Sequence, residues 1–390
     1  MDPATLESLI VKEIRKANSI SRRDLADQLD VARSTAGRRV DSLIERGLVK
    51  EDGLEERFEA GRPKRFLALC GEFGHFIGFD FDARHIFAVL TDFAQNVLAE
   101  EQIRLSTPAS RDEVMTQIKQ TMTKFESLGS TSPILGYGFG VPGRVRQEDR
   151  VGVSYPYIEG WSDVDFAESL ELDPADFYLE NNTKTIALGE YWLGHGTPPE
   201  HLVCVNIRTG ISAAVISNGH MLRGIHEMAG EIRGWKITGK PDPEWLEDGA
   251  TVRSILNNTT LTGWQKYVDA CLSGEKDAIA KLEAIVPYHA DAISRLVQLA
   301  DPELVVLSGA FNELGSLYLD RIRKATAEAL AHHYFDPPPI QFAAKGAFTG
   351  ALGAAALAAK HFKPDSSSIT PSPKPSRRRR GSRRRRQAAT

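Results

Sequence analysis

Three polar residues, Glu180, Asn181 and Asn182, follow the short apolar run at residues 177–179 and precede a segment with helical spacing. In open α/β sheets, ligands bind beyond the carboxyl ends of the strands. Carboxylate and amide groups in that place can accept and donate hydrogen bonds, so they suit a small polar molecule. The alternative is that Asn182 or Thr183 only caps the helix that follows. The rest of the chain favours the ligand-binding interpretation.

The length of 390 residues and a hydrophobic content of 42% predict a globular protein of two or three domains. Residues 1–17 mix charged and apolar side chains, and no later run reaches about 18 apolar residues, so we expect no membrane partner and a cytoplasmic, nucleoid-associated location. Three widely separated cysteines, Cys70, Cys204 and Cys271, offer neither a disulfide framework nor a cysteine zinc site.

The net charge of −4 is unevenly distributed along the chain. Residues 1–70 hold 14 Lys and Arg against 13 Asp and Glu, and residues 363–390 hold 10 against 1. The residues between them therefore hold 24 against 38. The ends of the chain favour polyanions such as DNA, and the middle repels them.

Residues 1–70 have the pattern of a DNA-binding domain with three short helices. Leu6 and Ile10 lie on one face of the first, Ser21 begins the second in a sequence like a capping box, and the third spans residues 32–46. This order predicts a helix-turn-helix, whose third helix can enter the major groove of double-stranded DNA. The candidate DNA-binding residues of that helix are Arg33, Ser34, Thr35, Arg38 and Arg39.

Two strand-like runs, at residues 48–51 and 65–69, predict a wing behind the three helices. Between them, the turn Gly61-Arg62-Pro63-Lys64-Arg65 presents Arg62 and Lys64, and an arginine held out in this way suits a narrow, electronegative minor groove. The alternative is a three-helix module for protein interaction whose arginines are simply solvated.

From residue 75 onward the pattern changes to α/β. Strand-like runs HFIGFDFD, HIFAVLTDF and VLAEEQIRL precede a helix at residues 111–128 and a buried strand at residues 134–141. A similar series follows as LVCVNIR, SAAVISNG and HMLRG, then helices and the strand LVVLSG. This approximate duplication predicts two lobes with a cleft between them.

The order and spacing of these segments resemble the ROK family, which is named for repressors, open reading frames and kinases. The resemblance spans about residues 5–360 and rests on the helix-turn-helix with its GRP wing, then GYGFGVPGRV, YPYIEGW, ENN with ALGE, GISAAVISNGHMLRG and AGEI. It implies an α/β chain: an N-terminal winged helix-turn-helix at residues 1–70, followed at residues 71–362 by a two-lobed, actin-like (ribonuclease-H-like) sugar-kinase fold. It also implies a sugar-type effector and a homodimer or homotetramer.

The kinase chemistry of the family is expected to be absent. ROK kinases hold ATP phosphates with glycine-rich turns, because bare backbone amides must approach the phosphate oxygens. Here the first turn is Asp80-Phe81-Asp82-Ala83-Arg84, and the second, Arg208-Thr209-Gly210-Ile211-Ser212, keeps one of three glycines. Asn182 replaces the aspartate that the family uses as the base, and an amide cannot accept the sugar proton. No catalytic residue and no cofactor are therefore predicted.

The resemblance leaves a candidate effector site of four residues, Asn181, Asn182, Glu231 and Glu247. Asn181 matches the sugar-contacting Asn of the family, Glu231 matches its ligand-contacting Glu, and Glu247 falls near its second Glu. The alternative is that both glutamates are ordinary surface acids. The zinc-binding His and cysteines of many members are missing, so no metal is expected. Because the site is altered, a familiar hexose is not assumed, and the open alternatives are a different sugar, a sugar acid, a sugar phosphate, or nothing.

The last residues, 363–390, contain a Ser/Pro-rich run and then RRRRGSRRRR, and we expect them to form a disordered basic tail. Such a tail either anchors the protein to DNA without sequence preference or binds acidic surfaces indiscriminately. The sequence thus predicts a transcriptional repressor of carbohydrate-related genes with a kinase-dead sensor domain. The rival hypotheses are a residual ROK sugar kinase and a ligand-free DNA-binding scaffold controlled by a protein partner.

Overall fold

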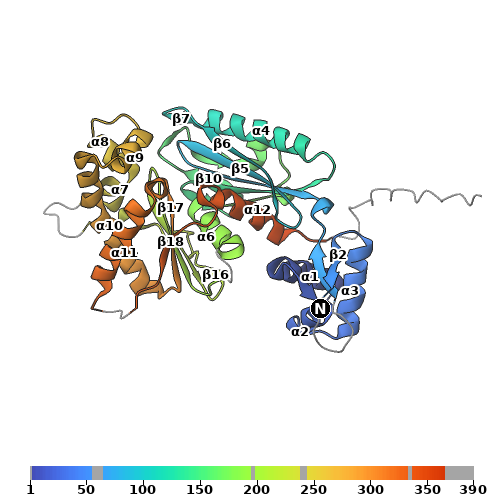
Figure 1. Cartoon of the computed structure of the whole chain (residues 1–390). Coiled ribbons are helices and arrows are strands. Elements are labelled where there is room, and N and C mark those ends of the chain that lie inside the picture. The colour runs from blue at the N-terminus through green and yellow to red at the C-terminus, as the bar shows by residue number, and fades with distance from the viewer. Residues whose placement is uncertain (1, 55–64, 195–197, 238–243, 333–335, 365–390) are drawn as a thin grey trace, which may run out of the picture. The chain divides into compact units, whose positions relative to one another are not determined.

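The computed structural model describes residues 2–54, 65–194, 198–237, 244–332 and 336–364 (Figure 1). Within it the chain forms two compact units, one containing residues 19–68 with the first 14 residues, and one containing residues 69–362 with residues 15–18. The helices that the structure describes lack the combination of length and apolar composition that crossing a membrane requires.

The first unit is a three-helix domain with a small sheet. Its helices are α1 (Pro3–Ala17), α2 (Arg22–Gln28) and α3 (Arg33–Glu45), and its strands β1 (Ile20–Ser21), β2 (Val49–Leu54) and β3 (Arg65–Leu69) pair in the order β1-β3-β2. Ser21 caps α2 by accepting a hydrogen bond from the Asp24 N–H at 3.1 Å. Leu25, Val40 and Leu43 are fully buried between the helices. The predicted helices and both wing strands are confirmed.

The first lobe of the second unit is built on a five-stranded sheet. Its strands are β4 (His75–Phe81), β5 (His85–Asp92), β6 (Val97–Arg104), β8 (Ile134–Val141) and β13 (Phe177–Asn181), in the order β13-β8-β4-β5-β6. Helix α4 (Arg111–Leu128) and the strand β8 have the bounds that the sequence predicts. Inside the lobe, the rings of Phe79 and Phe139 stack with centroids 5.3 Å apart.

Smaller elements complete this lobe. They are β7 (Ala109–Ser110), β9 (Arg144–Arg146), β10 (Val151–Ser154), β11 (Ile158–Glu159), β12 (Ser162–Asp165) and α5 (Phe166–Leu170). Strands β9, β10 and β12 form a separate three-stranded sheet, and β11 pairs with β7.

The second lobe repeats the same strand order. Strands β14 (Leu202–Ile207), β15 (Ile211–Ser217), β16 (His220–Met221), β17 (Leu304–Gly309) and β18 (Ile340–Phe342) pair in the order β16-β15-β14-β17-β18. In each lobe an antiparallel pair, β4 with β5 or β14 with β15, is extended by parallel strands. The predicted duplication is therefore present in the topology.

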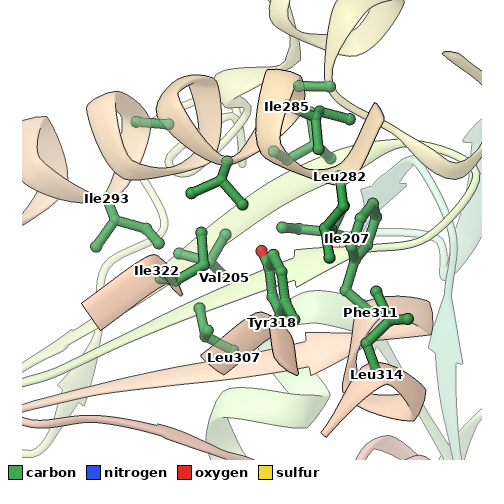
Figure 2. Close-up of a cluster of buried hydrophobic side chains, with 14 of the residues drawn as sticks. Val205, Ile207, Leu282, Ile285, Ile293, Leu307, Phe311, Leu314, Tyr318 and Ile322 are labelled. Atoms are coloured by element: carbon green, nitrogen blue, oxygen red, sulfur yellow. The ribbon is translucent and has the colours of Figure 1, made fainter. Parts of the chain in front are cut away.

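The helices of the second lobe cover its sheet. They are α7 (Leu246–Gly249), α8 (Val252–Asn257), α9 (Trp264–Leu272), α10 (Lys276–Ala300) and α11 (Ser316–Leu330). Figure 2 shows Val205 and Leu307 from the sheet packed against Leu282 and Ile293 of α10 and Tyr318 of α11.

Two helices rich in small residues, α6 (Asn182–Leu193) and α12 (Thr349–His361), cross each other closely in the second unit. A Cβ atom added at Gly353 of α12 would lie 1.9 Å from the Thr185 carbonyl of α6, and one at Gly138 of β8 would lie 1.9 Å from the Ala354 carbonyl. Any larger residue at these two glycines would force the helices and the sheet apart. The close packing fixes the start of α6, where the candidate site lies.

Candidate functional site

The polar residues after β13 are held by the start of α6. The Asn181 side-chain oxygen accepts hydrogen bonds from the N–H groups of Thr183 (2.9 Å) and Lys184 (3.3 Å), and its amide nitrogen donates to the Gly143 carbonyl (2.8 Å). The cap of α6 is thus Asn181, and the alternative that Asn182 or Thr183 caps it is wrong. Strand β13 runs through Asn181, so Asn182 is already the first helical residue.

A cleft lies between the two lobes, lined mainly by polar and charged side chains. All four predicted ligand residues, Asn181, Asn182, Glu231 and Glu247, line it. The other lining residues are Asp82, Pro142, Gly143, Tyr155, Asn206, Arg208, Gly210, Ile211, Ser212 and Arg233. The structure therefore brings together residues that are up to 66 positions apart in the predicted site.

The cleft contains a buried acceptor that sequence reasoning missed. Asn206, at the end of β14, is 4% exposed, and its amide nitrogen donates to the Thr183 hydroxyl at 3.2 Å. Among the described residues, its side-chain oxygen has no hydrogen-bond partner. A buried unpaired oxygen costs free energy unless a ligand or water donates to it, so this atom favours a hydroxyl-bearing ligand.

Two carboxylates face the cleft in different surroundings. Burial raises the pKa of Glu231, while the positive charges of Arg233 and Lys184 oppose the shift. Burial raises the pKa of the Tyr157 hydroxyl, and the negative charge of Glu247 raises it further. Tyr157 belongs to the first lobe and Glu247 to the second, so this interaction spans the cleft.

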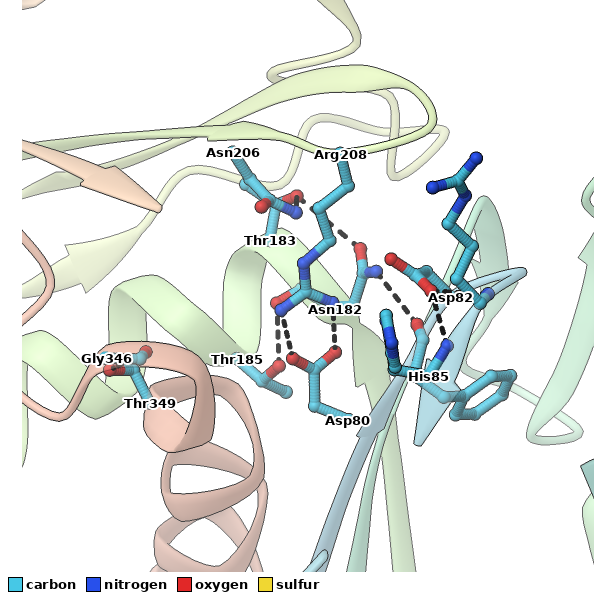
Figure 3. A network of polar contacts seen from close by, with 12 residues as sticks. Asp80, Asp82, His85, Asn182, Thr183, Thr185, Asn206, Arg208, Gly346 and Thr349 are labelled. Atoms are coloured by element: carbon cyan, nitrogen blue, oxygen red, sulfur yellow. Dashed lines mark hydrogen bonds and ion pairs between the residues drawn. The ribbon is translucent and has the colours of Figure 1, made fainter. Parts of the chain in front are cut away.

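At its base, the cleft is crossed by an ion pair that joins the two lobes (Figure 3). The Arg208 guanidinium contacts both oxygens of Asp80, at 3.2 Å and 2.6 Å, and lies over the Phe87 ring at 5.5 Å. Burial raises the pKa of Asp80 to about 6 against the opposing effect of Arg208. For Arg208, burial lowers the pKa, but the carboxylates of Asp80 and Asp82 outweigh it and raise the pKa overall.

Asp82 closes the turn after β4. Its carboxylate accepts hydrogen bonds from the N–H groups of Arg84 (2.7 Å) and His85 (2.9 Å). These amides, which follow the first strand, are therefore occupied by a side chain of the same turn. Nearby, the Asn182 amide nitrogen donates to the Phe81 carbonyl at 3.2 Å.

In the first unit, the predicted DNA-binding residues of α3 differ in their exposure and partners. Arg33, Ser34 and Arg38 are exposed and Thr35 is half-buried. Arg39 instead lies 3.6 Å from the carboxylate of Glu7, which is buried. The two wing residues of the prediction, Arg62 and Lys64, lie outside the described residues.

The sequence comparisons agree with this architecture. A model of the ROK family matches residues 76–240 and 248–361, and a model of the winged helix-turn-helix DNA-binding domain matches residues 5–50. The chain belongs to the ROK family. The predicted fold, a winged helix-turn-helix followed by a two-lobed sugar-kinase-like domain, is confirmed.

Curated relatives of this ROK chain include repressors. The xylose repressor of Caldicellulosiruptor bescii is 23% identical over 343 residues, which cover 81% of this chain and 86% of the relative. The transcriptional repressor Mlc of Escherichia coli is 22% identical over 370 residues, covering 88% and 90%. The glucokinase of Thermotoga maritima is 21% identical over 278 residues, covering 63% and 85%.

Solved structures show the same fold at low identity. A ROK-family transcriptional regulator described as a homologue of the E. coli Mlc protein has a TM-score of 0.72 at 18% identity, covering 92% of this chain and 98% of that one. A ROK-family glucokinase from Streptomyces griseus, in complex with glucose and AMPPNP, has a TM-score of 0.62 at 21% identity, covering 73% and 99%.

The family match leaves out residues 241–247, which include Glu247. Glu247 is therefore placed at the site by the structure and not by the family model. Among the described residues, no group of three or more His, Cys, Asp or Glu side chains is arranged to hold a metal ion.

Proposed function

We propose that this protein is a sequence-specific DNA-binding repressor of carbohydrate-related genes, whose ROK domain senses a sugar-type effector without phosphorylating it. The winged helix-turn-helix match and the xylose repressor and Mlc relatives support DNA binding and regulation. The cleft between the lobes supports a small polar effector. A homodimer or homotetramer in the cytoplasm, bound to an operator through paired winged domains, completes the proposal.

The main support for the absence of kinase activity is the position of Arg208. A nucleotide triphosphate needs free backbone amides at both turns that flank the cleft. Here the Arg208 side chain crosses from the second turn to pair with Asp80 at the first, and Asp82 occupies amides of its own turn. Asn182, at the place of the family's base, donates its amide to a carbonyl and cannot accept a proton at neutral pH.

DNA recognition would use the first turn of α3. Arg33, Ser34, Thr35 and Arg38 provide donors that can reach base edges or phosphates when the helix enters the major groove. Arg39 is better explained as a packing residue, because together with Arg46 it compensates the buried charge of Glu7. Arg62 and Lys64 remain candidates for the minor groove.

The effector would lie against Asn181, Asn206, Glu231 and Glu247. The Asn206 side-chain oxygen and the two carboxylates can pair with neighbouring sugar hydroxyls, and a sugar that leaves one of them unpaired is penalised. The names of the relatives make D-xylose and D-glucose the first sugars to test. Binding between the lobes would change the angle between them, and through it the spacing of two winged domains in a dimer.

A thermal-shift screen over pentoses, hexoses, sugar acids, sugar phosphates and ATP tests the proposal, because a ligand of the native state raises the melting temperature. We expect a shift with a sugar and none with ATP. A shift with ATP together with formation of a sugar phosphate would favour the residual kinase. No shift with any ligand would favour the scaffold controlled by a protein partner.

A further inference from the structure

Two buried charges beside the effector cleft have no part in the proposed function. Glu180, in β13, is 1% exposed, and Lys184, in the first turn of α6, is 2% exposed. They flank Asn181 and Asn182 in the sequence. A buried charge is tolerated only when partners compensate for the loss of water, so the partners of these two residues show what they stabilise.

Both partners come from one segment, residues 222–231, which we call the Glu231 loop. The Arg223 guanidinium pairs with the Glu180 carboxylate and lies 3.4 Å from that of Glu227. The Lys184 ammonium donates to the Glu227 carboxylate at 2.8 Å and to the Glu227 main-chain carbonyl at 3.2 Å. Four charges of alternating sign thus join the loop to the junction of β13 and α6.

Backbone hydrogen bonds tie the two ends of the Glu231 loop to β15, while those within the loop, such as the one from the Ala229 N–H to the Arg223 carbonyl at 3.1 Å, shape its turn. The Leu222 N–H donates to the Val215 carbonyl, and the Ala213 N–H donates to the Gly230 carbonyl, each at 2.8 Å. Gly230 has φ +90°, and a Cβ atom there would lie 1.9 Å from the Ala213 carbonyl. These contacts anchor both ends to β15 and place Glu231 directly after the second anchor.

The middle of the loop lacks an apolar anchor. Ile225 is 93% exposed, Leu222 50% and Met228 45%, so its large hydrophobic side chains do not pack into a core. Among the described residues, the ion pairs and side-chain hydrogen bonds that join the middle of the loop to the body of the domain are those of Arg223 and Glu227. Since no buried apolar side chain holds the middle of this segment, these charges are what ties it to the rest of the domain.

We infer that the network Glu180–Arg223–Glu227–Lys184 positions Glu231 opposite Asn181 across the effector cleft, which makes Arg223 and Glu227 positioning residues for effector binding. The inference rests on the proposed effector site. Lys184 interacts with residues on both sides of the cleft. Its N–H donates to the Asn181 side-chain oxygen, and its ammonium is close enough to Glu231 to oppose the rise of that carboxyl's pKa.

Hydrogen exchange of the full-length protein without ligand tests the network by itself. We expect Arg223→Gln and Glu227→Gln to raise the exchange rate of the amides of residues 222–232 about tenfold or more, with α10 unchanged. Arg223→Lys, which keeps the charge, should give a smaller increase. Arg146→Gln is the matched control, because Arg146 also pairs with two carboxylates, Asp149 and Asp163, but on the surface of the first lobe. Exchange at the wild-type rate in both loop variants would overturn the inference.

Titration with D-xylose and D-glucose tests the consequence for binding. For a sugar that the wild type binds, we expect Arg223→Gln to weaken affinity about tenfold, Arg223→Lys to recover part of it, and Arg146→Gln to bind like the wild type. Unchanged affinity in Arg223→Gln would contradict the positioning role. If the wild type binds neither sugar nor any other ligand of the screen, the effector proposal fails, and the exchange experiment still decides whether the charges hold the loop.

Discussion

The Arg208 guanidinium compensates a carboxylate, Asp80, that is completely buried, so removing it has a predictable cost. Arg208→Met retains much of the side-chain volume and leaves Asp80 without its partner. Breaking a buried ion pair from one side costs about 3–5 kcal/mol. For a domain of this size that corresponds to a fall in melting temperature on the order of 10 °C at pH 8.

The cost should depend on pH, because Asp80 titrates in mildly acid solution. The pKa of Asp80 is about 6 in the folded protein, against an ordinary value of 3.8. Between pH 3.8 and pH 6, the carboxyl therefore keeps its proton in the folded state but has lost it in the unfolded state. The contribution of Asp80 to the free energy of unfolding is fully present below pH 3.8. It falls by about 3 kcal/mol in all as the pH rises to 6. Without Arg208 the folded-state pKa rises further, and the loss continues above pH 6.

The difference in the free energy of unfolding between wild type and Arg208→Met should therefore be small at pH 5 and reach its full size at pH 8. Denaturant unfolding at both pH values measures it, with Asp80→Asn/Arg208→Met as the double variant that removes both charges and recovers most of the stability. Arg321→Met is the control, since Arg321 pairs with the exposed Glu283 and should cost under about 1 kcal/mol. An Arg208→Met effect below about 1 kcal/mol at pH 8, or equal at both pH values, would refute this reasoning.

Three further predictions concern the DNA-binding end and the tail. Arg38→Glu should abolish operator binding in a mobility-shift assay while sugar-induced stabilisation persists, and intact DNA binding in this variant would disprove the assigned surface. Arg39→Glu should instead lower the melting temperature, because the new carboxylate faces Glu7. Ser21→Ala removes the cap of α2 and should cost about 1 kcal/mol of stability, measured by denaturant unfolding, and no change would contradict the capping role. Deleting residues 364–390 should weaken binding to all DNA sequences alike and flatten its salt dependence, whereas a loss confined to one operator would contradict a non-specific role.

Long regular elements could be predicted from the sequence because their signals are local. The apolar run of β8 and the helical spacing of α4 gave bounds that agree with the structure. The duplicated strand order could also be inferred, since each lobe repeats the same sequence of strand-like runs. The gathering of Asn181, Glu231 and Glu247 around one cleft followed from the family resemblance and not from their spacing.

The missed features depend on contacts between distant segments. Asp80 and Arg208 are 128 positions apart, and nothing local indicates that Arg208 turns into the cleft toward a carboxylate. Arg39 has the spacing of an exposed residue, but the buried Glu7 of α1 pairs with it. Asn181 was predicted as a ligand residue, but its side chain also caps α6, because β13 continues two residues beyond the apolar run.

The central claim is that a sugar bound in the ROK domain controls DNA binding without being phosphorylated. Fluorescence anisotropy with labelled DNA from upstream of the protein's own coding region, with and without the sugar that gives the largest thermal shift, tests it most directly. We predict that the sugar changes the Kd for this DNA by about 5- to 150-fold, and that adding ATP changes it no further. A Kd that no sugar changes, or one that changes only when ATP is also present, would contradict it.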